Sequence, residues 1–288
     1  MQPKISFEFF PPKTAEGKSK LLATREQLNR FNPEYFSVTY GAGGSTRDNT
    51  RDIVLTLKAA GVDVAPHLSF GADSEQTILG ILEEYRAAGI NRIVALRGDL
   101  PSGMGAVKVV YANQLVKFIR SNFADHFTIE VAAYPEIHPQ AKSYADDIHW
   151  LGEKFRAGAN SAITQYFYNA DAYGYFLDQC RTAGIDQAIT PGIMPITNYQ
   201  NLVRFSDGCG AEIPRWIRQK MEALSDDSEA VRSFGEEVVT RLCEQLLSLG
   251  ATGFHFYTLN QLQATASILD NLGLGSEPAS NAPVANLH

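Results

Sequence analysis

Strand-like and helix-like segments alternate along almost the whole chain, and this alternation constrains the fold more than any other feature. Each strand-like run is nearly continuously hydrophobic, which is typical of parallel strands covered on both faces. Each run is followed by a segment whose apolar residues recur at helical spacing. The eight runs are 5–10, 35–40, 64–70, 92–98, 128–134, 161–168, 188–195 and 253–259. Eight successive βα units predict an α/β fold of the (β/α)8 TIM-barrel type.

The seventh unit departs from this regular pattern. Residues 206–230 intervene between its strand and the helix expected at 231–250, and we interpret them as an inserted helical segment. No low-complexity linker interrupts the chain, so we expect one catalytic barrel domain over residues 1–274. Residues 275–288 contain few large apolar residues and are expected to form a disordered tail.

Charge and cysteine usage exclude several classes of protein. The net charge is -7 and the pI is near 5.4, which argues against a nucleic-acid binder or a binder of anionic membranes. Cys180, Cys209 and Cys243 are isolated thiols, as expected in a reducing compartment.

Neither a signal segment nor a long apolar run is present, so we expect a cytoplasmic protein without membrane association. The histidines lack an HExxH spacing, and no metal site is expected.

Polar residues end seven of the eight predicted strands. In a TIM barrel the carboxyl ends of the strands form one rim, and the chemistry takes place there. Any one of these residues can be a hydrogen-bonded core group, but their convergence on one rim predicts an active site. They are Glu8, Thr39, His67, Arg97 with Asp99, Tyr134, Gln165 and Tyr257.

Glu8 raises a specific question, because it lies between Phe7 and Phe9 in the first strand, ISFEFF. A buried, unpaired carboxylate is costly, so it protonates or finds a partner. One interpretation is therefore a structural ion pair, and the other is a proton donor.

Two motifs that contain glycine follow predicted strands. YGAGGST, residues 40–46, lacks the third glycine of G-x-G-x-x-G, because Thr46 stands in its place, and we reject a Rossmann domain. In a barrel these glycines let the backbone pass close to a flat ligand. ALRGDLP places Arg97 and Asp99 two residues apart, so both side chains can face one ligand. The alternative enzyme, an aldolase or lyase barrel that uses a Schiff base, would need a lysine at a strand end, and none of the eight strands has one.

Eight strings occur in an order that resembles the methylenetetrahydrofolate reductase family from about residue 5 to about residue 272, in its bacterial form with the catalytic domain alone. They are FEFFPPK, SVTYGAGGS, APHL, IVALRGDLP, AAYPEIHPQAKS, GANSAITQYFY, PGIMPI and FHFYTLN. The resemblance implies a TIM barrel that holds FAD, and this FAD would be reduced by NADH or NADPH. The barrel would then reduce 5,10-methylenetetrahydrofolate to 5-methyltetrahydrofolate, which supplies one-carbon units for methionine synthesis. It also implies a homo-oligomer.

The resemblance assigns catalytic roles to two carboxylates. Glu8 aligns with the general acid that protonates N10 of the folate, which opens the ring to a cationic iminium at N5. We expect Phe7, Phe9 and Phe10 to give Glu8 an apolar setting that favours its protonated form. Asp99 aligns with an aspartate near the flavin and the pterin, and it is expected to favour the cationic iminium.

The resemblance also implies two sets of binding residues. Those for FAD are Thr39, Tyr40, Ala42, His67, Arg97, Gly98, Asp99, Tyr111, Tyr134, His138, Ala141, Asp147 and Lys154. Those for the substrate are Glu8, Asp99, Gln165, Asn201, Phe205, Tyr257 and Gln261.

Three residues depart from the family pattern. Trp150 replaces an asparagine near the adenosine of the flavin, Gln261 replaces a common arginine, and Asn201 replaces a glutamine. These departures leave open a flavin- or folate-binding barrel without turnover, although the retained Glu8 argues against it.

Overall fold

The computed structural model describes residues 2–41, 46–71, 73–98, 110–224 and 227–275. Its strands are β1 (Lys4–Phe9), β2 (Tyr35–Val38), β3 (Val64–Leu68), β4 (Arg92–Ala95), β5 (Thr128–Ala133), β6 (Ser161–Thr164), β7 (Ala188–Thr190), β8 (Gly192–Ile193) and β9 (Gly253–Tyr257). The helices that follow β1 to β6 are α1 (Ala15–Leu28) with the 3-10 turn η1 (Asn29–Phe31), α2 (Arg47–Ala59), α3 (Glu75–Ala87), α4 (Ala112–Phe123), α5 (Tyr144–Arg156) and α6 (Ala170–Thr182). The remaining helices are α7 (Tyr199–Cys209), α8 (Arg215–Ala223), α9 (Ser228–Ser248) and α10 (Gln263–Asn271).

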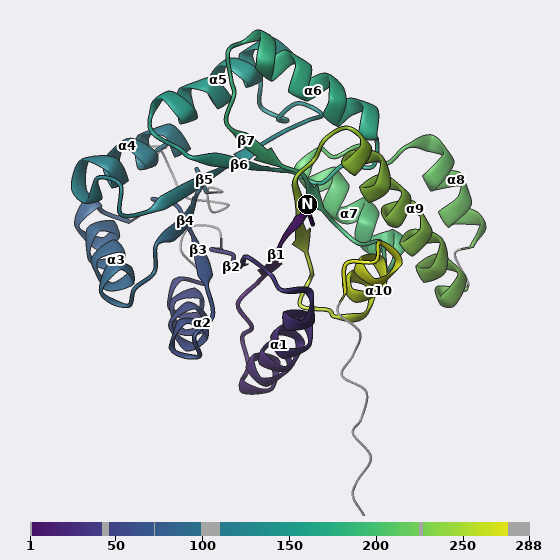
Figure 1. Cartoon of the computed structure of the whole chain (residues 1–288), viewed down its shortest axis with the longest axis horizontal. Helices are drawn as coiled ribbons and strands as arrows, with labels where there is room; N and C mark the ends of the chain where they lie inside the picture. Colours follow the sequence, from purple (N-terminus) through teal and green to yellow (C-terminus); the bar gives the residue numbers. More distant parts are fainter. Residues whose placement is uncertain (1, 42–45, 72, 99–109, 225–226, 276–288) are drawn as a thin grey trace, which may run out of the picture.

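All strand pairs are parallel, and the strands follow one another in the order β7-β6-β5-β4-β3-β2-β1-β9-β8. The two ends of this sheet, β7 and β8, are consecutive pieces of the chain, so the strands form a nearly closed barrel; Figure 1 shows β1 to β7 in succession around it. The predicted TIM barrel is therefore confirmed.

One predicted strand, 188–195, is divided in two. Pro191 lies between β7 and β8, and a proline cannot donate a ladder hydrogen bond. Gly192 N instead donates to Thr164 Oγ1 at 2.9 Å, and Tyr257 Oη donates to the Thr164 carbonyl at 2.6 Å. Side chains of β6 and β9 thus complete the wall at this seam between β7 and β8.

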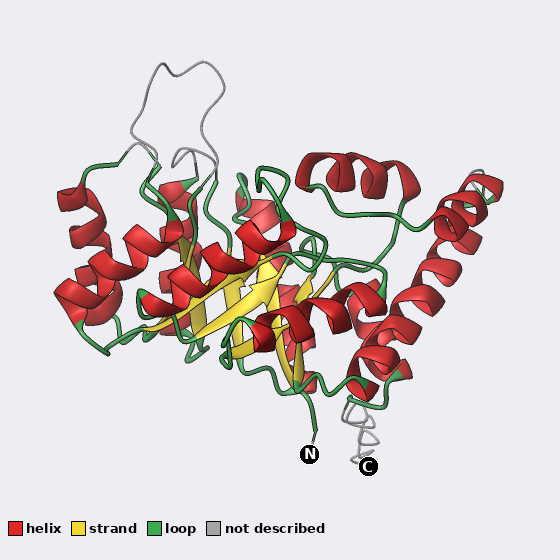
Figure 2. Cartoon of the chain, turned by 90° about the horizontal axis from the view of Figure 1, so that it is seen from above, coloured by secondary structure: helices red, strands yellow, loops and turns green. Residues whose placement is uncertain are grey.

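The helices surround the strands on the outside of the barrel (Figure 2). Several of them begin where a polar side chain accepts hydrogen bonds from their first backbone amides, which satisfies donors that have no intrahelical partner. These N-cap residues are Thr14, Ser74, Ser143, Asn169, Asn198 and Asp227.

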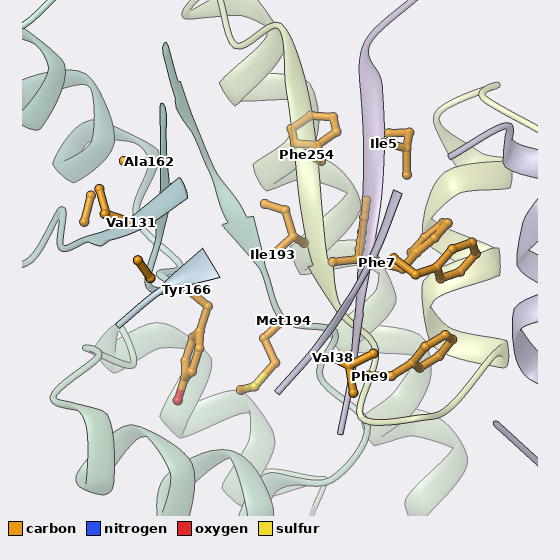
Figure 3. Close-up of a cluster of buried hydrophobic side chains, with 14 of the residues drawn as sticks. Ile5, Phe7, Phe9, Val38, Val131, Ala162, Tyr166, Ile193, Met194 and Phe254 are labelled. Atoms are coloured by element: carbon orange, nitrogen blue, oxygen red, sulfur yellow. The ribbon is translucent and has the colours of Figure 1, made fainter. Parts of the chain in front are cut away.

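The main hydrophobic core lies between the strands and the helices. Ile5, Phe7 and Phe9 lie on the same side of β1, and the rings of Phe7 and Phe9 both pack 5.5 Å from Phe36 on β2, measured between ring centroids (Figure 3). Because successive strand residues face opposite sides, Ser6 and Glu8 face the barrel interior. The alternation in β1 therefore gives one apolar face to the core and one polar face to the interior.

The irregular seventh unit contains α7, α8 and α9 in succession, which confirms the predicted helical insertion. Within the described ranges, every helix is too short or too polar to span a bilayer. The predicted disordered tail begins at residue 275, and from residue 276 it lies outside the described residues.

Candidate active site

A cavity of about 340 Å³ opens at the carboxyl ends of the strands. Six residues predicted from the sequence line it: Glu8, His67, Tyr134, Gln165, Phe205 and Tyr257. The remaining wall is mainly apolar and consists of Val94, Leu96, Val131, Ala132, Ile163, Tyr166, Met194, Cys209 and Leu259. A concave, mostly apolar cavity with a few converging polar groups is typical of a small-molecule site.

Glu8 lies in this cavity between two imidazoles. Its Oε2 is 3.3 Å from His67 Nε2 and 3.6 Å from His255 Nε2, and 17% of its side chain is exposed. The expectation that Phe7, Phe9 and Phe10 surround the carboxylate is wrong. Phe7 and Phe9 pack on the opposite face of β1, and Phe10 is 46% exposed. The immediate partners of Glu8 are therefore histidines.

His67 is nearly fully buried beside Glu8. Burial lowers the pKa of His67, because the charged imidazolium loses solvation, and the neighbouring Glu8 opposes this effect. The pKa of His67 is lowered further by His255. Its Nε2 is buried and has no hydrogen-bond partner among the described residues, since the contact with Glu8 lacks hydrogen-bond geometry. His67 thus presents an unsatisfied polar atom beside the cavity.

The loop after β9 covers part of the cavity with Leu259. Leu259 and Asn260 both adopt left-handed backbone conformations, with φ of 52° and 57°. Asn260 holds this turn against the end of β1: its Oδ1 accepts from Phe10 N at 3.0 Å, and its Nδ2 donates to the Phe10 carbonyl at 2.8 Å. The last strand and the first strand therefore share one side of the site.

Several predicted cofactor residues lie beside β5 and α5, outside the cavity wall. His138 N donates to Asp147 Oδ2 at 2.8 Å, and the His138 ring packs edge-on against Tyr134. Ala141 follows in the same turn, where its N donates to the His138 carbonyl at 2.8 Å. Lys154 Nζ donates to the carbonyl of Ala132, which does line the cavity, at 2.7 Å.

Lys154 gives a testable pH dependence. Burial lowers its pKa from 10.5 to about 8, and Asp147 partly opposes this shift. Between these two values the unfolded chain binds more protons than the folded chain, so the free energy of unfolding should rise with pH. Lys154→Met should remove the part of this rise that Lys154 contributes, as measured by urea unfolding from pH 7 to 10.5. Lys220→Met, which changes an exposed lysine on α8, should keep the parental slope. The same slope in Lys154→Met and in the parent would contradict the shift.

Further predicted cofactor residues follow β2 and β4, at the same rim of the barrel. Thr39 N donates to the Phe9 carbonyl at 2.9 Å, Tyr40 Oη donates to Asp73 Oδ2 at 3.0 Å, and Arg97 donates to Gln140. Gly98 has a φ of 77°. A Cβ at this position would lie 2.4 Å from Ser69 Oγ, so the chain can turn here only at a glycine.

The remaining predicted residues lie outside the cavity or outside the described residues. Tyr111 and Trp150 are exposed, and their rings are nearly parallel, with centroids 6.5 Å apart. Asn201 lies in the first turn of α7 and Gln261 lies in the loop before α10, and both are exposed. Ala42 and Asp99 fall outside the described residues.

Sequence reasoning missed four polar residues at or near the cavity. Tyr166 and Cys209 line it, and Tyr166 Oη hydrogen-bonds Ser206 at 3.0 Å. His255 lies in the middle of β9, and only its register with Ser6 on β1 places it beneath Glu8. Glu136 follows β5 in the string YPEIHP, and burial raises its pKa to about 7. A search for polar residues within three positions after each strand finds Tyr166 and Glu136 but neither Cys209, at the end of α7, nor His255.

Within the described residues, no group of three or more His, Cys, Asp or Glu side chains has the arrangement of a metal site.

Comparisons with known proteins agree on one family. The model of the family described as methylenetetrahydrofolate reductase matches residues 1–273. The 5,10-methylenetetrahydrofolate reductase of Escherichia coli K12 is 41% identical over 274 residues, which cover 95% of this chain and 92% of the relative. Methylenetetrahydrofolate reductase (NADH) 1 of Arabidopsis thaliana is 38% identical, and the match covers 96% of this chain and 49% of the relative.

Solved structures support the fold. A Clostridium thermocellum protein described as binding two copies of 5-methyl-5,6,7,8-tetrahydrofolic acid superposes with a TM-score of 0.61 at 17% identity, covering 95% of this chain and 93% of that chain. A 2,3-dimethylmalate lyase superposes with a TM-score of 0.55 at 10% identity, covering 98% of this chain and 87% of that chain. At these identities the likeness concerns the barrel alone.

Proposed function

The chain belongs to the methylenetetrahydrofolate reductase family, and from this premise we propose that it reduces 5,10-methylenetetrahydrofolate to 5-methyltetrahydrofolate. The hydride would come from NADH or NADPH through bound FAD, and the product would supply methyl groups for methionine synthesis. The observation that carries the proposal is the position of Glu8. It is a carboxylate inside an apolar cavity, and its near neighbours are two histidines.

The cavity fits a flat nitrogen heterocycle such as the flavin ring. Its apolar walls favour ring packing, and the unsatisfied Nε2 of His67 can hydrogen-bond to a ring heteroatom. His67 and Tyr134 would hold the ring, while the predicted residues along α5, at the ends of β2 and β4, and at Tyr111 would hold the remainder of FAD. When bound, FAD supplies hydride transfer, which no side chain can perform.

Glu8 would act as the general acid of the folate step. Ring opening of the folate requires a proton at N10, and a carboxyl group in the cavity can deliver it. Gln165, Phe205 and Tyr257 line the same cavity and would orient the substrate. The apolar wall would exclude bulk water, so the proton comes from a defined group.

Other parts of the proposal depend on the resemblance alone. Asp99 would stabilise the cationic iminium of the folate, and Asn201 and Gln261 would contact its glutamate tail. The homo-oligomeric state, the cytoplasmic location and the single catalytic domain over residues 1–274 also stay predictions.

An anaerobic absorption spectrum tests the proposal. The purified protein, supplemented with FAD, should be yellow, should be bleached by NADH or NADPH, and should regain its colour when methylenetetrahydrofolate is added. A protein that cannot be reconstituted with FAD would contradict the proposal. Bleaching by NADH without recovery on addition of the folate would instead favour the binding barrel without turnover.

A further inference from the structure

The residues between α7 and α8 pack against the loop that follows β5, and Glu136 in that loop is hydrogen-bonded to them. Residues 210–214 form this α7–α8 corner, and residues 134–143 form the β5 loop. Glu212 N donates to Glu136 Oε2 at 2.8 Å, which joins the two segments across 76 residues of chain. Because the donor is a backbone amide, the bond holds the corner itself and not a flexible side chain.

Close packing accompanies this hydrogen bond. Gly210 begins the corner with a φ of 77°, and a Cβ there would lie 2.6 Å from Pro139 Cγ in the β5 loop. Ala211 and Ile213 are buried on either side of Glu212. A small cavity lined by both segments has a volume of about 10 Å³, room for about one water molecule. The corner and the loop are therefore in close contact.

The two joined segments carry residues from both parts of the candidate site. Tyr134 and His138 lie in the β5 loop and are predicted to contact FAD. Phe205 and Cys209 lie on α7, shortly before the corner, and line the larger cavity. The hydrogen bond to Glu136 thus joins the wall of the substrate cavity to a segment that is predicted to hold the cofactor.

The β5 loop has attachments of its own to the first turn of α5. His138 N donates to Asp147 Oδ2 at 2.8 Å, and Tyr144 Oη donates to the Pro135 carbonyl at 3.1 Å. Loss of the hydrogen bond to Glu136 should therefore leave the loop in place. It should release the corner together with the carboxyl-terminal end of α7.

We propose that Glu136 is a positioning residue, which holds the end of α7 against the β5 loop and thereby fixes Phe205 and Cys209 in the wall of the larger cavity. Within the described residues, Glu136 borders the smaller cavity and not the larger one, so it acts through α7 and not on the substrate. The hold on α7 rests on the contacts between the two segments, while its effect on folate binding rests on the proposed function.

The surroundings of Glu136 favour its neutral form. Burial raises its pKa to about 7, the hydrogen bond from Glu212 N opposes this shift, and the charge of the Glu212 side chain adds to it. Tyr166 and Tyr168 lie near it after β6, and burial raises their pKa values, so both stay uncharged. Among the described residues, Glu136 Oε1 is buried without a hydrogen-bond partner. Glutamine, which is neutral and keeps an oxygen for Glu212 N, is therefore a conservative replacement.

Alkylation of Cys209 measures the position of α7 without reference to catalysis. Cys180 and Cys243 are buried, whereas Cys209 is partly exposed. The full-length protein is treated with N-ethylmaleimide at pH 7, and each cysteine is followed by mass spectrometry. Labelling of Cys209 should be about 10-fold faster in Glu136→Ala than in Glu136→Gln, the effect expected from loss of one hydrogen bond. Glu136→Gln should stay close to the parent.

Two results of this labelling would overturn the proposal. One is equal labelling of Cys209 in Glu136→Ala and Glu136→Gln, which would show that the hydrogen bond does not hold α7. The other is a parallel rise at Cys180, which would show that the whole fold has loosened.

A second variant disturbs the same contact sterically, which keeps the test decisive where Glu136→Ala fails to fold. In Gly210→Ala the added Cβ would meet Pro139, and alanine is disfavoured at a positive φ, so labelling of Cys209 should rise as in Glu136→Ala. Gly208→Ala, inside α7, is the matched control, because its Cβ would have no neighbour within 4 Å among the described residues. Parental labelling in folded Gly210→Ala, or an equal rise in Gly208→Ala, would overturn the proposal.

Equilibrium binding separates the effects on the two ligands. Glu136→Ala loaded with FAD should bind 5-methyltetrahydrofolate about 10-fold more weakly than the parent, because Phe205 is no longer held in the wall. Its dissociation constant for FAD should stay close to the parental value, since the β5 loop keeps its attachments to α5, and Glu136→Gln should bind both ligands as the parent does. Equal weakening of both ligands would show a general structural role and overturn the positioning role. A parent that binds no folate would count against the proposed function, and the labelling of Cys209 would then decide the hold on α7.

Discussion

Replacing Glu8 with glutamine should lower the rate of folate reduction by about 10²–10⁴-fold, the usual contribution of a general acid. Glutamine keeps the length and shape of the side chain but has no proton to transfer. FAD binding and flavin reduction by NADH do not need that proton, so both should stay close to the parental values. The measurement is stopped-flow absorbance of each half-reaction, followed separately.

Glu34→Gln is the matched control, because Glu34 precedes β2 at the opposite end of the barrel, where it pairs with Lys4 on the surface. It should leave both half-reactions unchanged. A folate rate in Glu8→Gln within a few-fold of the parent would show that another group or solvent protonates N10. Loss of the fold or of the flavin would favour the other interpretation of Glu8, as a structural ion-pair partner whose removal is strongly destabilising.

Gly192→Ala should destabilise the barrel by about 3 kcal/mol or more, at the upper end for overpacked sites. Gly192 begins β8 at the seam between β7 and β8, and an added Cβ would lie 2.1 Å from the Thr164 carbonyl oxygen and 2.7 Å from Tyr257 Cε2. The carbonyl oxygen belongs to the backbone of β6 and cannot move aside as a flexible side chain can. Urea unfolding followed by circular dichroism measures the loss.

Tyr257 makes this substitution informative about the site as well. Its hydroxyl donates to the same Thr164 carbonyl, and its ring lines the cavity, so folded Gly192→Ala should bind FAD or folate more weakly. Gly174→Ala, inside α6, is the control, since its Cβ would make only ordinary contacts with Leu249 at 3.7 and 3.8 Å. We expect this control to gain about 0.5–1 kcal/mol, because alanine loses less entropy in a helix. Equal stability of Gly192→Ala and the parent would mean that Thr164 and Tyr257 can move away from β8 to accommodate the added methyl group.

The architecture could be predicted from the sequence because each βα unit is local. Continuous apolar runs and helical spacing are visible within about 30 residues, and eight repeats allow few closed arrangements. The break at Pro191 was visible too, since proline is confined to strand edges and bulges, but the run around it is apolar enough to be read as one strand.

The candidate site was less predictable, because its chemistry depends on register between strands far apart in the chain. The position of Glu8 at a strand end was visible, and the structure places it in the cavity. Its neighbours were not, since the side-chain period of two sends Phe7 and Phe9 away from it. His255 comes within reach only through the pairing of β9 with β1, and no local pattern encodes that pairing. The roles assigned to the individual residues stay predictions.

The pairing of the first strand with the last determines when this site comes into existence during synthesis. The backbone carbonyl of Glu8 accepts hydrogen bonds from Thr258 N at 3.3 Å and from Thr258 Oγ1 at 2.6 Å, across 250 residues of chain. Glu8 is therefore synthesised near the start of translation, but the hydrogen bonds that hold its backbone form only after Thr258 has been synthesised. A nascent chain that has left the ribosome as far as α9 has neither His255 nor Thr258 to orient the carboxylate, and β1 still presents an unpaired edge. A chain that lacks β9 thus also lacks these contacts with Glu8, and among the described residues the pairing of β9 with β1 joins segments about as far apart in sequence as the barrel allows, which is expected to form late in folding.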